Sequence, residues 1–278
     1  MEEEKAADVV GKSSRIKKIA LAELGARLPI GVGPTLEKDF GVRVWKTKDE
    51  RELGQKKKSA KRFGEFVTVV LGHMLSSLGG VAFGPELDAN QRALMFSNMY
   101  VADVLYAWLY LRREAIGPTL DLRVTCPRCP DTKFQFAGDL NSVEIGTVDS
   151  LDDLTWTYVL KHPIEVRKKR VESFQVRTPT WGHIKDFIGD PNTSLAKLLA
   201  VRSAIIGVNG ESAPVRLTEN ELDELSKVDF EGIFAGFSSP TEFLGPNMAI
   251  EVECPSCMHP LFQPIDWTYD GFFSISSR

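Results

Sequence analysis

Hydrophobic and polar residues change along the chain from strand-like alternation to helical spacing, and this change occurs twice. In the first half, an apolar stretch at 29–32 is followed by an alternating stretch at 42–45. In the second half, the corresponding stretches lie at 163–166 and 174–177, with the basic RKKR at 167–170 between them as a turn. Alternation is typical of a half-buried strand, so each half is predicted to open with a β-hairpin.

Each predicted hairpin is followed by a stretch in which apolar residues have helical spacing. In the first half this stretch covers 66–78 and ends at Gly79-Gly80; in the second it covers 195–205 and ends near Gly207. Glycine directly after an apolar stripe commonly ends a helix. Both stretches are therefore predicted to be helices that end at these glycines.

A further helix start follows in each half. Asp88 precedes Gln91 by three positions, and Thr218 precedes Glu221 in the same way, which is the capping-box pattern. In the first half the chain continues into an aromatic-rich helix around 95–111. We attribute its aromatic residues to core packing, with a partner surface as the alternative.

The same order of elements in both halves favours an internal duplication. Each half ends in a Gly-Pro pair, at 117–118 and 245–246, placed the same number of positions before a Cys-x-x-Cys that begins at Cys126 or Cys254. We predict an α+β fold of two β-hairpin/helical units related by a pseudo-two-fold axis.

The predicted boundaries follow from this repeat. The first unit is expected to cover residues 15–145 and the second 146–278, each with one cysteine pair. Residues 1–14 are polar and are expected to form a flexible tail.

The cysteine pairs carry the most specific chemistry in the sequence. The four cysteines of the chain are Cys126, Cys129, Cys254 and Cys257. One Cys-x-x-Cys turn presents two thiolates to a metal, and two such turns complete a tetrahedral zinc site. We predict a structural Zn²⁺ held by all four, with each pair at the tip of a β-hairpin, in the manner of a zinc ribbon split by residues 130–253. Four thiolates leave no open position for water or substrate.

Other uses of the cysteines fit the sequence less well. His259 could replace one cysteine as a ligand. A redox pair would need a strand-to-helix context and would not need a second copy. Disulfides are not expected, because the chain does not begin with the charged and apolar regions of a secretory signal. We therefore expect folding in a reducing compartment.

Composition and charge exclude several classes. With 43% hydrophobic and 26% charged residues in 278, the chain has the composition of an ordinary globular protein. A net charge of −4 gives no general attraction to nucleic acid or anionic lipid. The longest apolar run with helical character, 100–111, is too short to cross a bilayer.

Catalytic motifs are missing from the sequence. It contains no nucleophile elbow, phosphate-binding loop, dinucleotide fingerprint or HExxH. The basic run at 55–62 could contact phosphate, but such runs are more often a solvated helix face. The histidines, with no paired spacing, are His73, His162, His183 and His259. We predict neither an enzyme nor a small-molecule substrate.

The order of elements from Leu28 to Asp139 resembles that of the T4-type baseplate hub assembly proteins of contractile-tailed phages and related prophage tail proteins. A weaker similarity continues as far as Asp266. The most specific part runs from Asp103 along the helix to the V-T-C-P-x-C that ends at Cys129. The resemblance departs at Pro130 and Met258, where such cysteine turns usually carry glycine.

The resemblance implies a non-enzymatic structural or assembly role in a contractile tail baseplate, in its hub or wedge region, or in a tail-like injection machine. It implies other tail or baseplate proteins as partners, and a location in the virion after assembly in the host cytoplasm. A resident subunit and a departing chaperone both remain open.

The alternative is a zinc-ribbon module that binds nucleic acid. Against it, only Arg123, Arg128 and Lys133 lie close to the first cysteine pair, and no basic residue lies close to the second. Apolar residues after the second pair are expected either to form a partner surface or to pack on the chain's own core. They are Leu261, Phe262, Trp267, Phe272 and Phe273.

Overall fold

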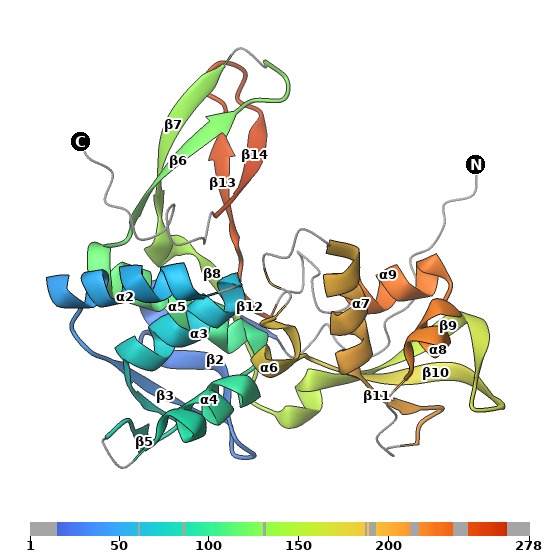
Figure 1. Ribbon diagram of the computed structural model, residues 1–278. Coiled ribbons are helices and arrows are strands. Elements are labelled where there is room, and N and C mark those ends of the chain that lie inside the picture. The colour runs from blue at the N-terminus through green and yellow to red at the C-terminus, as the bar shows by residue number, and fades with distance from the viewer. Residues whose placement is uncertain are drawn as a thin grey trace.

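The chain folds into a mixture of helices and small antiparallel sheets, which confirms the predicted combination of α and β elements (Figure 1). The computed structural model describes residues 16–60, 62–84, 87–129, 132–186, 188, 193–211, 217–235 and 244–265. The predicted tail at 1–14 and the aromatic residues Trp267, Phe272 and Phe273 lie outside these ranges.

The first half is built around a four-stranded antiparallel sheet with the order β2-β3-β4-β5. Its strands are β2 (Arg27–Val32), β3 (Glu37–Val42), β4 (Leu75–Leu78) and β5 (Val81–Ala82). Its helices are α1 (Leu21–Leu24), α2 (Thr47–Ser59), α3 (Phe63–Met74), α4 (Ala89–Asn98) and α5 (Val101–Ile116). Phe96, Tyr106 and Trp108 are fully buried in the core of this half. Core packing therefore explains these aromatic residues. The single helix predicted at 95–111 is wrong, because Met99 and Tyr100 are extended and separate α4 from α5, with Tyr100 forming a β-bridge to Thr180.

The second half is built around a three-stranded sheet with the order β11-β10-β9. Its strands are β9 (Thr155–Val166), β10 (Lys169–Arg177) and β11 (Ile205–Val208). Its helices are α6 (Trp181–Ile184), α7 (Thr193–Ala204), α8 (Glu219–Asp223) and α9 (Lys227–Ala235). A separate hydrophobic core, which includes Trp156 and Phe174, lies between this sheet and its helices. The β9–β10 turn at Arg167 and Lys168, both with positive φ, is the turn predicted for RKKR.

A third sheet connects the N-terminal, middle and C-terminal parts of the chain. It has the order β1-β8-β12. Its strands are β1 (Lys17–Ala20), β8 (Glu144–Thr147) and β12 (Gly245–Pro246). Two short 3-10 helices flank β8, namely η1 (Leu140–Ser142) and η2 (Leu151–Leu154). β8 therefore spans the boundary predicted between the two units at 145/146.

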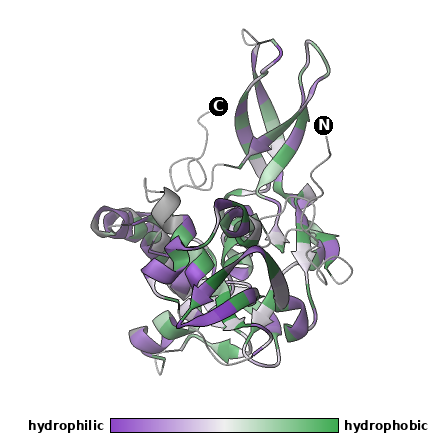
Figure 2. Ribbon diagram, turned by 90° about the vertical axis from the view of Figure 1, so that its right-hand side faces the viewer, coloured by the Kyte–Doolittle hydropathy of each residue, from purple (hydrophilic) through white to green (hydrophobic). Residues whose placement is uncertain are grey.

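Two hairpins project together from the body of the molecule (Figure 1). The first is β6 (Thr119–Thr125) with β7 (Lys133–Asp139), and the second is β13 (Ala249–Glu253) with β14 (Pro260–Pro264). We call these four strands and their cysteine turns the ribbon. Burial alternates strictly along β6, and hydrophobic and hydrophilic positions alternate along the projecting strands in Figure 2. The inner faces pack on each other, since a Cβ at Gly138 would meet the side chain of Ile250.

Two of the predicted helix ends are wrong. Helix α3 ends at Met74, and the chain continues as strand β4, which pairs with β3. Gly79 and Gly80 both have positive φ and form the two-residue turn between β4 and β5. In the second half α7 ends before Ile205, and strand β11 follows. Short apolar segments after a helix satisfy helical spacing equally well, so sheet pairing decides their conformation.

The predicted strand at 42–45 is also wrong, because β3 covers Glu37–Val42 and ends there. The backbone N–H of Arg43 donates to the carbonyl of Met74, and its guanidinium forms an ion pair with Asp49 at 2.9 Å. Val44 is 77% exposed. The alternating sequence therefore lies in the connection to α2, where the contacts of Arg43 replace strand pairing.

Both predicted capping boxes are confirmed. Asp88 accepts a hydrogen bond from the backbone N–H of Gln91 at 2.8 Å and begins α4. Thr218 accepts one from the N–H of Glu221 at 3.2 Å and begins α8. Each cap satisfies backbone donors that the first turn of a helix leaves unpaired.

Two fully buried aspartates attach a helix to a strand in the same way in the two halves. Asp103, the third residue of α5, accepts hydrogen bonds from two consecutive β2 amides at 2.8 and 3.2 Å. Asp229, the third residue of α9, accepts them from two consecutive β9 amides at 2.7 and 3.1 Å. Sequence reasoning assigned no role to either residue. An acidic residue at the same place in two apolar helices is the signal that could have revealed them.

Helix α3 contacts the second half of the chain at Gly64. A Cβ at this position would overlap the backbone carbonyl of Lys185, so the contact requires glycine. We expect Gly64→Ala to lower the free energy of unfolding by about 2 kcal/mol, because the backbone of Lys185 cannot move as a side chain can. Chemical denaturation measures this change.

The control is Gly54→Ala in the exposed helix α2, where no atom lies within 4 Å of the added Cβ. This substitution should raise stability by about 0.5–1 kcal/mol, since alanine restricts the unfolded chain. Equal effects of the two substitutions would show that the Gly64 contact is not tight.

Candidate metal centre

The base of the ribbon brings together cysteine pairs that are far apart in the sequence. β8 and β12 are hydrogen-bonded neighbours, and the chain leaves the first hairpin into β8 and enters the second from β12. A glycine with positive φ precedes each hairpin, namely Gly117 (φ 115°) and Gly245 (φ 88°). These conformations are readily available only to glycine, which explains the repeated Gly-Pro pair.

The four predicted ligand sulfurs meet at the far end of the ribbon. Cys126 Sγ lies 3.7 Å from Cys257 Sγ, and Cys129 Sγ lies 3.5 Å from Cys254 Sγ and 3.6 Å from Cys257 Sγ. Four thiolates about 2.3 Å from a central zinc, at tetrahedral angles, would be about 3.8 Å apart. A disulfide would need about 2.05 Å. The sulfur arrangement therefore fits a single tetrahedral metal ion.

The backbone around the sulfurs holds them in place. Cys126 and Cys254 are fully buried, Cys129 is partly buried and Cys257 is exposed. The N–H of Cys126 donates to the carbonyl of Thr132 at 3.3 Å, and that of Cys254 donates to the carbonyl of His259 at 3.0 Å. These bonds close the two turns, so each cysteine pair is fixed by its own hairpin.

Local hydrogen bonds give the thiols different proton affinities. Burial acts to raise the pKa of Cys254, but hydrogen bonds from the amides of Ser256 and Cys257 outweigh it and lower this pKa to about 6. Hydrogen bonds with Cys126 and Cys254, together with burial, raise the pKa of Cys129 to about 12. A cation bound here would replace thiol protons, so metal binding would release protons.

His259 does not join this group. Among the described residues, the ligand atoms that lie within 4.8 Å of one another here are the four cysteine sulfurs, without a histidine nitrogen. The sulfurs alone supply the four donors of a tetrahedral site. The cysteines are therefore the better candidates, and their binding of a metal stays a prediction.

Met258 follows the second cysteine pair in a left-handed conformation, with φ of 56°. At this position, the cysteine turns of the proteins that the sequence resembles usually carry glycine. We expect Met258→Gly to stabilise the metal-loaded protein by about 1 kcal/mol, because glycine adopts positive φ without the steric cost of a Cβ.

Thermal unfolding measures the effect of Met258→Gly. The control is Ser256→Gly in the same turn, where φ is not positive, and which should slightly destabilise the protein. A loss of stability in Met258→Gly comparable with that in the control would contradict this interpretation.

A second group of potential metal ligands, Asp49, Glu52 and His73, has a structural explanation. Asp49 is fully buried and accepts hydrogen bonds from the N–H of Lys46 at 2.8 Å and from Arg43 at 2.9 Å. Its Oδ1 also lies 3.0 Å from Nε2 of His73. These contacts fix the start of α2 against α3, and they already occupy the carboxylate of Asp49 and the ring nitrogen Nε2 of His73.

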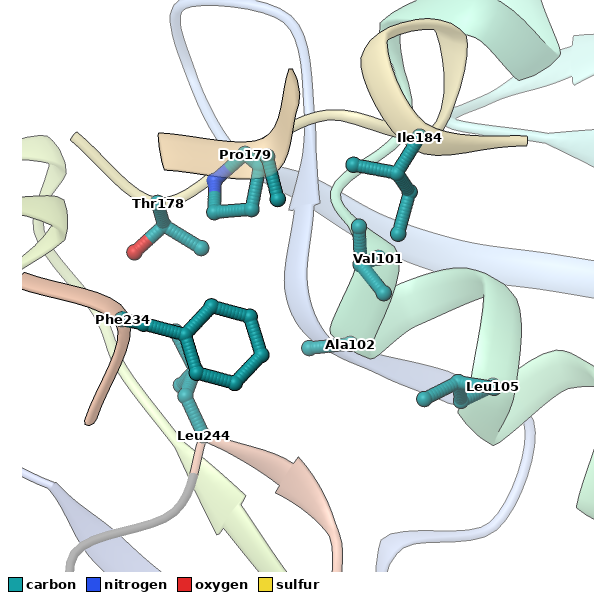
Figure 3. Close-up of a pocket in the computed structure, with 9 residues that line it drawn as sticks. Val101, Ala102, Leu105, Thr178, Pro179, Ile184, Phe234 and Leu244 are labelled. Carbon is teal, nitrogen blue, oxygen red and sulfur yellow. The ribbon is translucent and has the colours of Figure 1, made fainter. Parts of the chain in front are cut away.

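An apolar cavity of about 220 Å³ lies between the two halves (Figure 3). The side chains that line it include Val101 and Ala102 from α5, Pro179, and Phe234 from α9. Thr178 Oγ1 is buried nearby without a hydrogen-bond partner. No charged residue lines the cavity among the described residues, so its lining supplies no acid, base or charged ligand.

The fold and the site together define a class: a protein of small antiparallel sheets that carries a projecting two-hairpin ribbon closed by four cysteines. Comparison with known families assigns the chain to one family. The model of the family described as T4 bacteriophage base plate protein matches residues 37–265, and the chain belongs to this family. It therefore has a structural role in a phage baseplate and a place in the virion.

The family match confirms the resemblance expected from the sequence. A search of curated proteins and of solved structures finds no match. Among the described residues, no helix is both long and apolar enough to span a membrane.

Proposed function

We propose that the chain is a non-enzymatic structural or assembly component of a contractile tail baseplate, in its hub or wedge region, or of a tail-like injection machine. The observation that carries the proposal is the family match, which covers both hairpins and both helical regions. The apolar lining of the cavity and the absence of catalytic motifs in the sequence favour a role without turnover.

The proposal includes a structural Zn²⁺ bound by Cys126, Cys129, Cys254 and Cys257. Its support is the spacing of the four sulfurs, which is close to that of a tetrahedral zinc–thiolate site. With four thiolates as ligands, the ion would have no open position for a substrate. The ion would join two hairpins that are far apart in the sequence, at the end of the ribbon away from the body.

The proposal also includes an internal duplication with units at 15–145 and 146–278. It is supported by the matched order of elements and by the two buried aspartates, each third in its helix and each bound to two strand amides. The two separate hydrophobic cores are a further argument. A pseudo-two-fold relation between the units would place its axis between the two hairpins, which pack on each other.

A deletion experiment tests the function. Tails should be isolated from the phage or prophage that encodes the chain, with the gene intact, deleted, or supplied from a plasmid. The proposal expects few complete baseplates without the gene, as counted by electron microscopy, and rescue by the plasmid. Complete baseplates at normal yield in the deletion strain would refute it.

The composition of the rescued particles separates the two structural roles. A resident subunit remains in purified tails at a fixed ratio to other tail proteins, whereas an assembly factor is needed but absent from them. Mass spectrometry of the purified tails measures this ratio. An assembly factor would be found in the host cytoplasm while tails form.

Nucleic-acid binding is the alternative function. Arg123 and Lys133 are exposed on the first hairpin, but Asp121 and Asp139 lie on the same strands. A salt titration of binding to duplex and single-stranded DNA distinguishes the alternatives, because phosphate contacts give a steep dependence on salt. The proposed role expects no salt-dependent binding in the micromolar range.

A further inference from the structure

The two hairpins of the ribbon have the same construction but different outer faces. Arg123 and Gln135 lie opposite each other in the first hairpin, and Glu251 and Phe262 lie opposite each other in the second. Arg123 and Glu251 each precede the first cysteine of their hairpin by the same number of residues, so the two pairs correspond. All four side chains are exposed. A charged-polar pair on one hairpin is thus replaced by an acidic-aromatic pair on the other.

The outer face of the second hairpin is apolar at its centre and acidic at its edge. Phe262 is 70% exposed and Met258 66% exposed, and both lie on or next to β14. Glu251 and Glu253 flank them on β13. Among the described residues, the first hairpin has no large exposed apolar side chain. An exposed aromatic residue on a projecting element is a common centre of a protein interface.

The free edge of β14 is unsuited to strand addition. Because the N–H of Cys254 donates to His259, the ladder places the backbone nitrogens of residues 260, 262 and 264 on the outer edge. Pro260 and Pro264 have no N–H to donate. A partner at this edge of β14 therefore has to be recognised by side chains, not by extension of the sheet.

From these observations we infer that the outer face of the second hairpin, with Phe262 at its centre and Glu251 and Glu253 beside it, docks onto another baseplate protein. This inference rests on the proposed function. The acidic border selects a partner surface with an apolar pocket for one aromatic ring, bordered by lysine or arginine. The chain's own residues 266–278 include two aspartates and one arginine, so they do not complement the acidic border, which favours a basic partner within the baseplate.

The test transfers the outer pair of the first hairpin to the second. Phe262→Gln and Glu251→Arg, singly and together, should be supplied to the deletion strain as full-length chains. The yield of complete baseplates should fall at least about tenfold with Phe262→Gln, as expected for a central interface residue, and further in the double variant. The matched control Gln135→Ala should give the wild-type yield.

Zinc content and melting temperature of the purified variants serve as folding controls, and both should equal those of the wild type. A photo-reactive phenylalanine analogue at position 262 then identifies the contact. Crosslinks to another tail protein next to lysine or arginine support the inference. Crosslinks to a second copy, or to residues 266–278 of the same chain, overturn it.

The two proposals fail in different ways. If complete baseplates form without the gene, the proposed function fails and takes this inference with it. If the gene is required and Phe262→Gln restores a wild-type yield, only the docking inference fails.

Discussion

The purified protein is expected to contain about one zinc ion per chain, and the Cys254→Ser, Cys257→Ser double variant is expected to contain none. Two thiolates alone cannot complete a tetrahedral zinc site. The binding free energy of structural zinc is on the order of 10 kcal/mol, and here it would act as folding energy of the ribbon. Elemental analysis measures the metal content.

Loss of zinc should unfold the ribbon and leave the body folded. The inner faces of the two hairpins pack on each other near Gly138 and Ile250, and both hairpins carry buried apolar residues, among them Leu122 and Val252. Within the described ranges, the core of the second half contains no cysteine, and the cysteines that belong to the cluster of the first-half core lie in the ribbon. A strong chelator should therefore abolish protection of ribbon amides in hydrogen exchange and only slightly change that of α5 or β10.

The control for this experiment is a Ser142→Ala variant, which alters an exposed hydroxyl near the base of the ribbon and should keep its zinc. Full zinc occupancy in the double cysteine variant would exclude the four-cysteine site. Identical exchange with and without chelator would exclude a stabilising role for the metal.

The site could be predicted from the sequence more fully than the surrounding fold. Cysteine spacing is a local property, and the repeated Gly-Pro pair marked both hairpins without knowledge of the rest. The 3.5–3.7 Å sulfur separations agree with that prediction. Capping boxes are local in the same sense, and both were located correctly.

The errors concern segments whose conformation depends on distant partners. Residues 75–78 and 205–208 continue a helical pattern of apolar residues, yet each becomes a strand because a neighbouring strand offers backbone hydrogen bonds. Arg43 does not lie in a strand as predicted, because its guanidinium pairs with the buried Asp49 and donates to the carbonyl of His73, thirty positions later. No window of local sequence contains this information.

The roles of Asp103 and Asp229 were missed for a related reason. A single acidic residue in an apolar helix is usually assigned to a solvent-facing position. Only the packing of α5 on β2, and of α9 on β9, shows that each carboxylate replaces missing strand partners. We expect replacement of such a carboxylate to lower the free energy of unfolding strongly.

Replacement of Asp103 by alanine is expected to lower the free energy of unfolding by about 4 kcal/mol. The substitution leaves two buried β2 amides without acceptors, and each unpaired buried donor costs about 1–3 kcal/mol. Asp103→Asn should cost about half as much, because one side-chain oxygen still accepts. The control Asp121→Asn removes an exposed carboxylate on β6 and should have no measurable effect.

The effect of Asp103→Asn should also depend on pH. Burial raises the pKa of Asp103 from 3.8 to about 7, although the two β2 amides and Lys38 act to lower it. Between these values the folded protein keeps a proton that the unfolded chain has lost. The contribution of this proton to stability is therefore complete below about pH 4 and is lost as the pH rises through about 7.

The stability difference between wild type and Asp103→Asn should accordingly be larger at pH 5 than at pH 8. Both proteins are measured in the same buffers by chemical denaturation, so the titration of the cysteines and of other carboxylates cancels in the difference. A constant difference from pH 5 to pH 8 would show that Asp103 stays ionised, held by the two β2 amides. Asp103→Ala within about 1 kcal/mol of wild type would show that these amides find other acceptors, and that the buried carboxylate does not fix α5 to β2.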